Sequence, residues 1–299
     1  MINTKRRYFN TNTKAKIKKA LGKLLVYGFL ALACLLVLGP FYIAITTSFK
    51  TPIEAQGLDF TWFPKEFTIN GYKDVFTYTG GSRFTTPLIV RGFLNTILMV
   101  LPRALISTIF SGMAGFAYAK LNFKCKNTMF AVLLSTMMVP GIITLIPSYI
   151  MFFELGWINT PWPVVLPALL GTTGAVFFMK QYYMGVPSDM MEAASVDGLG
   201  YFGTYFKIMF PISMPAFWAQ FVLAFVGGYN EYLGPMLYLT KPQMYTMQIA
   251  MQQFATSRQK TDPGAVMASA VIALLPIVAL FLLAQKQFIS GVVTSGVKL

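Results

Sequence analysis

Long apolar blocks, separated by shorter polar segments, follow one another along most of this chain. A helix needs about 20 apolar residues to cross the hydrocarbon core of a bilayer. Six blocks reach roughly that length, so we predict an all-α polytopic membrane protein with six transmembrane helices. The predicted spans cover residues 24–47, 94–119, 128–153, 164–184, 211–239 and 265–288.

The polar segments divide the chain into regions. A basic N-terminal segment, a first transmembrane helix and an external loop precede the main transmembrane domain, which contains a cytoplasmic loop and is followed by a short C-terminal tail. The predicted bounds, in the same order, are 1–23, 24–47, 48–90, 91–290 with its loop at 187–211, and 291–299. The first span is longer than a signal-peptide core of about 7–15 residues, so we expect it to be retained.

Composition agrees with this topology. The 299 residues are 56% hydrophobic and only 11% charged, whereas soluble domains carry about 25% charged residues. The formal net charge of +14 is concentrated before the first span, in Lys5, Arg6, Arg7, Lys14, Lys16, Lys18, Lys19 and Lys23. Basic segments beside a span favour the cytoplasmic side, so both termini are predicted to be cytoplasmic. The rest of the chain has no basic surface with aromatic side chains between the charges, so nucleic-acid binding is not expected.

The residues that usually carry enzyme chemistry are scarce. Histidine is absent, and the two cysteines, Cys34 and Cys125, lie at different expected depths and are not expected to pair. Without histidine the chain lacks the usual general base and a common metal ligand. We therefore predict no catalytic residue, no metal site and no cofactor bound by this chain.

Two ionisable residues fall inside predicted spans, and neither has an evident partner in the sequence. Arg103 either snorkels outward or faces the bundle interior, whereas Glu231 is expected to line a passage or to pack between helices. Several spans also contain helix breakers, which indicate either ordinary kinks or a bundle with an internal passage. These breakers are Pro102, Pro140–Gly141, Pro147, Pro235 and Pro276.

The segment 187–211 is too polar to span a membrane and too apolar for a free loop. Asp189 and Glu192 have the spacing of a capping box, which predicts a short helix over about 190–197. Gly198 is expected to end that helix. A second helix, starting at Leu199, would place Phe202, Phe206 and Met209 on one face, and Pro211 would begin the next span. Such a protrusion either enters a groove of a partner protein or lies on lipid.

The same segment carries a specific resemblance. Glu192, Ala193 and Ala194, followed by Gly198, Ile208 and Pro211, resemble the EAA loop of ABC importer permeases, with Phe210 where leucine is usual. Residues 155–167, 230–239 and 285–299 are similar to the carbohydrate, maltose-type class of that family. In that class the tail usually reads G-A-V-K-G, whereas here it is Ser295-Gly296-Val297-Lys298-Leu299.

The resemblance implies a type I, MetI-like importer fold and a set of partners. These are a second permease subunit in a heterodimer, two ABC ATPase subunits, an extracytoplasmic solute-binding protein, and a sugar or oligosaccharide as substrate. This chain lacks the G-x-x-x-x-G-K-[ST] loop that cradles nucleotide phosphates. ATP and Mg²⁺ are therefore expected to be bound by the partner ATPase subunits.

The resemblance also suggests roles for individual residues. The candidates for coupling to the ATPase are Glu192, Ala193, Ala194, Asp197, Gly198, Ile208 and Pro211. The tail candidates, expected to reach between the ATPase subunits, are Gly291, Gly296, Val297 and Lys298. Candidates for contact with the binding protein, in the external loop at 240–264, are Gln252, Gln253, Arg258 and Lys260.

Candidates for lining the substrate pathway are aromatic or hydrogen-bonding residues in suitable spans: Tyr149, Tyr229, Asn230, Glu231 and Tyr232. The alternative for each of them is packing against the partner permease.

Two other classes of protein compete with this interpretation. An ion-coupled secondary carrier would require paired titratable groups within the spans, and Arg103 and Glu231 show no evident mate. A membrane-embedded enzyme is disfavoured by the absence of histidine and of paired intramembrane carboxylates.

Overall fold

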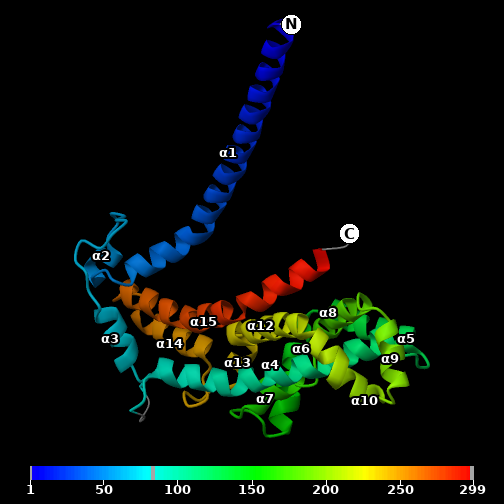
Figure 1. The fold of residues 1–299 in the computed structure, drawn as a ribbon. Helices are drawn as coiled ribbons and strands as arrows, with labels where there is room; N and C mark the ends of the chain where they lie inside the picture. Colours follow the sequence, from blue (N-terminus) through cyan, green and yellow to red (C-terminus); the bar gives the residue numbers. More distant parts are fainter. Residues whose placement is uncertain (1, 82–84, 297–299) are drawn as a thin grey trace.

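The computed structural model describes the backbone of residues 2–81 and 85–296, and the side chains of residues 19–81 and 85–285. Over these residues the chain is helical, without a strand (Figure 1). Four helical segments are long and apolar enough to cross a membrane, and two bent helix pairs raise the number to six if each pair is one span. The all-α polytopic prediction is confirmed.

The helix α1 (Ile2–Thr47) stands apart from the rest of the molecule and meets it only near its C-terminal end (Figure 1). Its candidate span, Lys19–Thr47, has none of its most apolar window buried within the chain. Because exposed apolar side chains cover the part of this helix with described side chains, residues 19–47, they must meet lipid or another protein chain.

The segment predicted as an external loop contains two short helices, α2 (Pro52–Gln56) and α3 (Asn70–Thr77). The Thr51 hydroxyl accepts a hydrogen bond from the Glu54 amide and so caps α2. At α3, a Cβ atom on Gly71 would lie 3.0 Å from the Cα atom of Ala265, so α3 lies directly against the start of α15 (Pro263–Gly296).

The bundle is built around α4 (Leu88–Lys120), which packs against α8 (Thr173–Met184), α12 (Met214–Asn230) and α14 (Met247–Arg258). Small residues allow these close approaches, as is common between membrane helices. A Cβ atom on Gly115 would lie 2.7 Å from the Met179 Cβ atom, and one on Gly92 would lie 2.7 Å from that of Ala250.

The third predicted span is broken rather than straight. It consists of α5 (Lys126–Ser135), the 3-10 turn η1 (Thr136–Met138) and α6 (Gly141–Glu154), with a bend of 92° at Pro140. The fourth span is also composite, since α7 (Trp162–Val165) and the 3-10 turn η2 (Leu166–Ala168) precede α8.

The fifth span begins later than predicted. Pro211 lies in the short helix α11 (Phe210–Ile212), and α12 starts at Met214 after a bend of 81°. At its other end α12 stops at Asn230, and α13 (Leu233–Tyr238) follows after the break at residues 231–232. The predicted span at 211–239 therefore holds two breaks, at Ser213 and at Glu231.

The helix breakers act differently at different positions. Pro140 lies at the 92° bend, whereas Pro102, Pro147 and Pro276 lie inside continuous helices. Pro235 lies inside the short helix α13. Most of these prolines are thus accommodated within a helix, and one, Pro140, lies where a span is broken.

Candidate coupling loop and membrane passage

The helix α9 (Asp189–Val196) lies at the end of the bundle opposite α2 and α3 (Figure 1). Gly198 ends it with a left-handed φ of +76°. The Gly198 amide donates to the Ser195 carbonyl at 3.1 Å, and the Leu199 amide donates to the Ala194 carbonyl at 2.9 Å. These two bonds form a Schellman cap, in which glycine is the residue that best tolerates the backbone conformation. Gly198 ends the helix as predicted.

The predicted capping box is wrong. Ser188 is the N-cap residue, its side chain makes no cap hydrogen bond, and Asp189 is already the first residue of the helix. Asp189 and Glu192 instead place negative charge in the first turn, where the helix dipole favours it.

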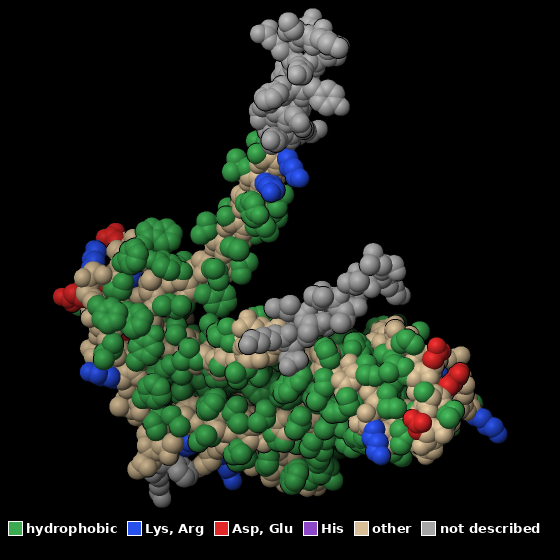
Figure 2. Space-filling view, viewed as in Figure 1, with side chains coloured by type: hydrophobic (Ala, Val, Ile, Leu, Met, Phe, Trp, Pro, Cys, Tyr) green, Lys and Arg blue, Asp and Glu red, His purple; other side chains and the backbone are tan. Residues whose placement is uncertain are grey.

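The coupling candidates differ in exposure. Glu192, Ala193, Asp197 and Gly198 are exposed, whereas Ala194 is completely buried. Farther along, Ile208 is half-buried and Pro211 is exposed. Acidic side chains gather at this end of the molecule, beside α9 (Figure 2). The structure therefore presents one face of α9 outward and buries Ala194 on the other face.

Exposed apolar side chains lie at the end of α9 and in the segment that follows it. They are Val196, with 87% of its surface exposed, and Tyr201, Phe202 and Phe206. Contiguous exposed apolar surface beside charged residues is typical of protein or membrane contact sites.

The predicted face of Phe202, Phe206 and Met209 is wrong at Met209, which is fully buried while both phenylalanines are exposed. The short helix α10 (Tyr201–Thr204) is followed by a π-helical turn, η3 (Tyr205–Met209). A π turn contains more residues per turn than an α-helix, so it rotates the following side chains away from the α-helical register.

Tyr205 connects this turn to α4. Its side chain is buried and its ring centroid lies 5.5 Å from that of Phe116. Its hydroxyl is so close to Gly112 that a Cβ atom there would lie 2.6 Å from the oxygen. The π turn that follows α9 and α10 is thus packed against the central helix of the bundle.

Arg103 and Glu231 lie together within the bundle. The Arg103 Nη1 atom lies 3.1 Å from the Glu231 Oε2 atom and also donates to the Val164 carbonyl at 2.9 Å. The expectation that these residues lack partners was wrong, and so was the alternative that Arg103 snorkels outward. Glu231 lies in the break between α12 and α13, which brings it to α4 from a distant part of the sequence.

Three hollows meet at Glu231. The largest, a cavity of about 560 Å³, is lined by Arg103, Ser107, Thr172, Gln220 and Glu231 among small and apolar side chains. The other two, of about 410 and 370 Å³, are lined by Glu231 together with Tyr238 and residues of α6. Glu231 therefore borders all three spaces.

The other pathway candidates are placed differently. Tyr232 lines the hollow of about 410 Å³, and the half-buried Tyr149 stacks on Tyr238 with ring centroids 6.5 Å apart. Asn230 is exposed and accepts a hydrogen bond from Gln248 at 3.3 Å. Tyr229 is fully buried and its hydroxyl donates to the Ala273 carbonyl at 2.8 Å, so it lines none of these three hollows.

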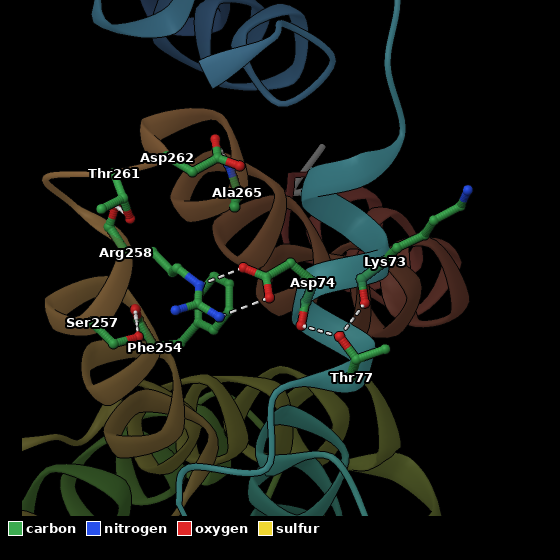
Figure 3. Close-up of polar contacts among 9 residues, drawn as sticks. All are labelled: Lys73, Asp74, Thr77, Phe254, Ser257, Arg258, Thr261, Asp262 and Ala265. Carbon is green, nitrogen blue, oxygen red and sulfur yellow. Dashed lines mark hydrogen bonds and ion pairs between the residues drawn. The ribbon is translucent and has the colours of Figure 1, made fainter. Parts of the chain in front are cut away.

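At the α2–α3 end, an ion pair fixes α14 in place (Figure 3). The Arg258 Nη2 atom donates to the Asp74 Oδ1 atom at 2.9 Å, and the guanidinium lies 5.2 Å from the Tyr78 ring centroid. The hydrogen bond to Asp74 raises the pKa of Arg258 above its ordinary value. Gln252, Gln253 and Lys260 are exposed on and beside the same helix.

The tail candidates lie at the limit of the structure. Gly291 and Gly296 belong to α15, but their surroundings are outside the described side chains, and Val297 and Lys298 lie outside the described residues altogether. Among the residues with described side chains, no cluster of three or more histidine, cysteine, aspartate or glutamate residues could hold a metal ion.

Comparison with known proteins gives relatives along almost the whole chain. The chain is 31% identical over 287 residues to an arabinooligosaccharide transport system permease protein, AraQ, of Halalkalibacterium halodurans, covering 95% of this chain and 99% of that protein. It is 27% identical over 289 residues to a maltodextrin transport system permease protein, MalD, of Streptococcus pneumoniae, covering 96% and 99%.

The fold has a counterpart among solved structures. A bacterial ABC transporter involved in the import of the acidic polysaccharide alginate contains a chain that superposes with a TM-score of 0.75 at 18% identity, covering 90% of this chain and 96% of that one. Residues 107–293 match the family described as binding-protein-dependent transport system inner membrane component. With a matched segment of that length and relatives that align end to end, this chain belongs to the family of inner membrane components of binding-protein-dependent transport systems.

Proposed function

We propose that this chain is one of two permease subunits of an ATP-driven importer for a sugar or oligosaccharide. The proposal is supported by family membership and by relatives named for arabinooligosaccharides and maltodextrins. A binding protein outside the cell delivers the sugar, two ATPase subunits bind ATP and Mg²⁺, and a second, different permease completes the passage. Both termini of this chain face the cytoplasm.

The observation that carries this proposal is the glycine-ended helix α9, held outward at one end of the bundle. Its exposed face offers Glu192, Ala193 and Asp197 to a partner, while Ala194 and the Schellman cap at Gly198 fix its position. This face enters a cleft of an ATPase subunit. The tail residues Gly291, Gly296, Val297 and Lys298 reach between the two ATPase subunits.

Movement of α9 must change the bundle for ATP to drive transport. Tyr205, in the π turn after α10, packs on Phe116 and against Gly112 of α4. Since α4 also carries Arg103, one continuous helix joins the ATPase contact to the passage. Closure of the ATPase dimer shifts the bundle between two access states, with nucleotide binding supplying the difference in free energy.

The sugar passes along the cavity that Arg103 and Glu231 border. Ser107, Thr172 and Gln220 supply hydroxyl and amide groups in its wall, which suit the hydroxyl groups of a carbohydrate. Tyr232 lines the neighbouring hollow of about 410 Å³. Tyr149 stacks on Tyr238, which lines the same hollow. On the outer side, Gln252, Gln253 and Lys260 contact the binding protein, while Arg258 holds α14 to α3.

The test is reconstitution with the partners encoded beside this chain. The complete complex in lipid vesicles should hydrolyse ATP faster when binding protein and a maltodextrin or arabinooligosaccharide mixture are both present. Uptake should cease without the ATPase subunits. Uptake of sugar by the purified chain alone, driven by a proton or sodium gradient, would instead establish the secondary carrier.

A further inference from the structure

A set of aromatic side chains lies beside the C-terminal end of α1, outside the passage and the coupling loop. We call Phe60, Trp62 and Phe63, in the segment between α2 and α3, the aromatic cluster. Trp62 has 63% of its surface exposed and Phe63 has 71%. The Phe60 and Trp62 rings meet edge to face at 4.9 Å. Rings of this size are usually buried unless they contact something outside the chain.

The cluster is held in place by hydrogen bonds rather than left loose. The buried Lys50 donates through its ammonium group to the Thr61 carbonyl at 2.7 Å. The Thr61 hydroxyl donates to the Glu54 carboxylate at 2.7 Å, and the Lys65 amide donates to the same carboxylate at 3.1 Å. Because the backbone on both sides of Trp62 is fixed, the projecting rings need little further ordering when they contact a surface.

Tyr42 of α1 sets the position of the cluster relative to the membrane. Its hydroxyl donates to the Trp62 carbonyl at 3.0 Å, and its ring lies edge-on to Phe63 at 6.1 Å. Tyr42 precedes the end of α1 at Thr47 by about 7.5 Å of helix, at 1.5 Å per residue. Since α1 is a candidate membrane span, its terminal turns lie where the hydrocarbon meets the headgroups.

From this geometry we infer that the aromatic cluster inserts into the membrane interface at the C-terminal end of α1. The occupant of the exposed face is lipid, at the boundary between headgroups and acyl chains, where tryptophan and tyrosine are enriched in membrane proteins. Apolar side chains lie on the side of this region nearest α1, and charged side chains lie along its far edge (Figure 2). That division suits a segment that lies in the membrane interface, with its apolar side toward lipid and its charged side toward water.

The anchor has a structural consequence. The same segment continues into α3, whose Asp74 holds Arg258 of α14. Lipid contact at the aromatic cluster therefore helps to fix the position of α3, to which α14 is held by the Asp74–Arg258 pair. This inference does not depend on the substrate or on the ATPase contact.

The chain contains four tryptophans, so Trp62 can be isolated as a fluorescent probe. Trp157, Trp162 and Trp218 are replaced by phenylalanine, as is every tryptophan of the partner subunits, and the complete transporter is reconstituted in vesicles of phosphatidylcholine and phosphatidylglycerol. Quenching is measured with lipids carrying a nitroxide near the headgroup, lipids carrying it near the chain end, and acrylamide in water. A matched variant retains only Trp157, whose ring stacks on Phe152 within the chain.

Trp62 should be quenched about twofold more by the headgroup-proximal nitroxide than by the deep one, and only weakly by acrylamide, as an interfacial ring would be. The Trp157 variant should show no such dependence on nitroxide depth. Strong acrylamide quenching without nitroxide quenching would overturn the inference in favour of a water-facing surface. Protection from every quencher would overturn it in favour of contact with a protein subunit.

Discussion

The guanidinium of Arg103 lies 3.1 Å from the carboxylate of Glu231, although 128 residues separate the two in sequence. The pair joins α4 to the break between α12 and α13, and the second bond from Arg103, to the Val164 carbonyl, adds α7. A broken membrane helix leaves backbone groups and charges that require partners within the protein. The pair supplies them at the point where three hollows meet.

Replacing Glu231 by glutamine should destabilise the chain because it leaves the Arg103 charge without its partner. The side chains of Arg103 and Glu231 are 20% and 41% exposed, so the expected loss is about 1–2 kcal/mol, below the 3–5 kcal/mol typical of fully buried pairs. Thermal unfolding in detergent measures it. The double variant Arg103→Gln with Glu231→Gln should lose less stability than the two single losses combined. Strict additivity would show that the contact contributes nothing.

Gly198 should tolerate asparagine better than valine. Its φ of +76° lies in the left-handed region, where a β-branched residue is strained and asparagine is tolerated. No atom lies within 4 Å of the position a Cβ would take, so the effect is one of backbone conformation and not of crowding. Gly198→Val should reduce sugar-stimulated ATP hydrolysis about tenfold, equivalent to about 1.4 kcal/mol, while Gly198→Asn should retain most of it.

Gly200 provides the matched control for that experiment. Its φ of −71° is ordinary for any residue, and it also has open space around it. Gly200→Ala should therefore leave stimulated hydrolysis unchanged. Equal losses at both glycines would contradict the account, because general perturbation of the segment would then suffice to produce them.

Gly112→Ala should disturb the contact between Tyr205, in the π turn η3, and α4. The added Cβ would lie 2.6 Å from the Tyr205 hydroxyl oxygen, so the tyrosine must move. Overpacking of this kind usually costs about 1–3 kcal/mol. The prediction is a lower unfolding temperature together with weaker coupling of ATP hydrolysis to uptake.

Removing the tyrosine hydroxyl should reverse that effect. Tyr205→Phe clears the space that the new methyl group requires, so Gly112→Ala with Tyr205→Phe should recover much of the lost stability and coupling. If the double variant is as impaired as Gly112→Ala alone, the proposed contact is not the cause.

Exchanging the charges of Asp74 and Arg258 tests whether Arg258 acts by positioning α14. Asp74→Asn should raise the concentration of binding protein needed for half-maximal ATP hydrolysis, with little change in the maximal rate, because α14 loses its fixed orientation. The pair is partly exposed, so its contribution to stability is about 0.5–1 kcal/mol. Asp74→Arg combined with Arg258→Asp should restore the wild-type value. Loss in the swapped variant equal to that of Arg258→Asp alone would indicate direct contact with the binding protein.

The sequence predicted those features that local chemistry determines. Bilayer thickness sets the length of apolar blocks, so the spans could be located, and glycine's access to positive φ indicated the end of α9 at Gly198. The coupling candidates Glu192, Ala193 and Asp197 are exposed, and their contact with an ATPase subunit stays a prediction.

Features that depend on distant residues could not be located in this way. Asp74 and Arg258 are 184 residues apart, so no local pattern relates them. Glu231 can reach Arg103 because α12 ends at Asn230, just before it, and that end was not predicted. The opposite charges of Arg103 and Glu231, both inside predicted spans, were the one signal available for that pair. The π turn at Tyr205–Met209 was not predicted, and it separates the buried Met209 from the exposed Phe202 and Phe206, which were expected to share its face.

Crosslinking in the assembled transporter shows whether α9 contacts an ATPase subunit. A photo-reactive amino acid is placed at Val196, the exposed last residue of α9, and as a control at Leu98, which is exposed on the membrane-spanning α4. Position 196 should crosslink to an ATPase subunit, with a yield that changes when ATP is added, and position 98 should not. Crosslinks from position 196 to lipid alone would contradict this contact.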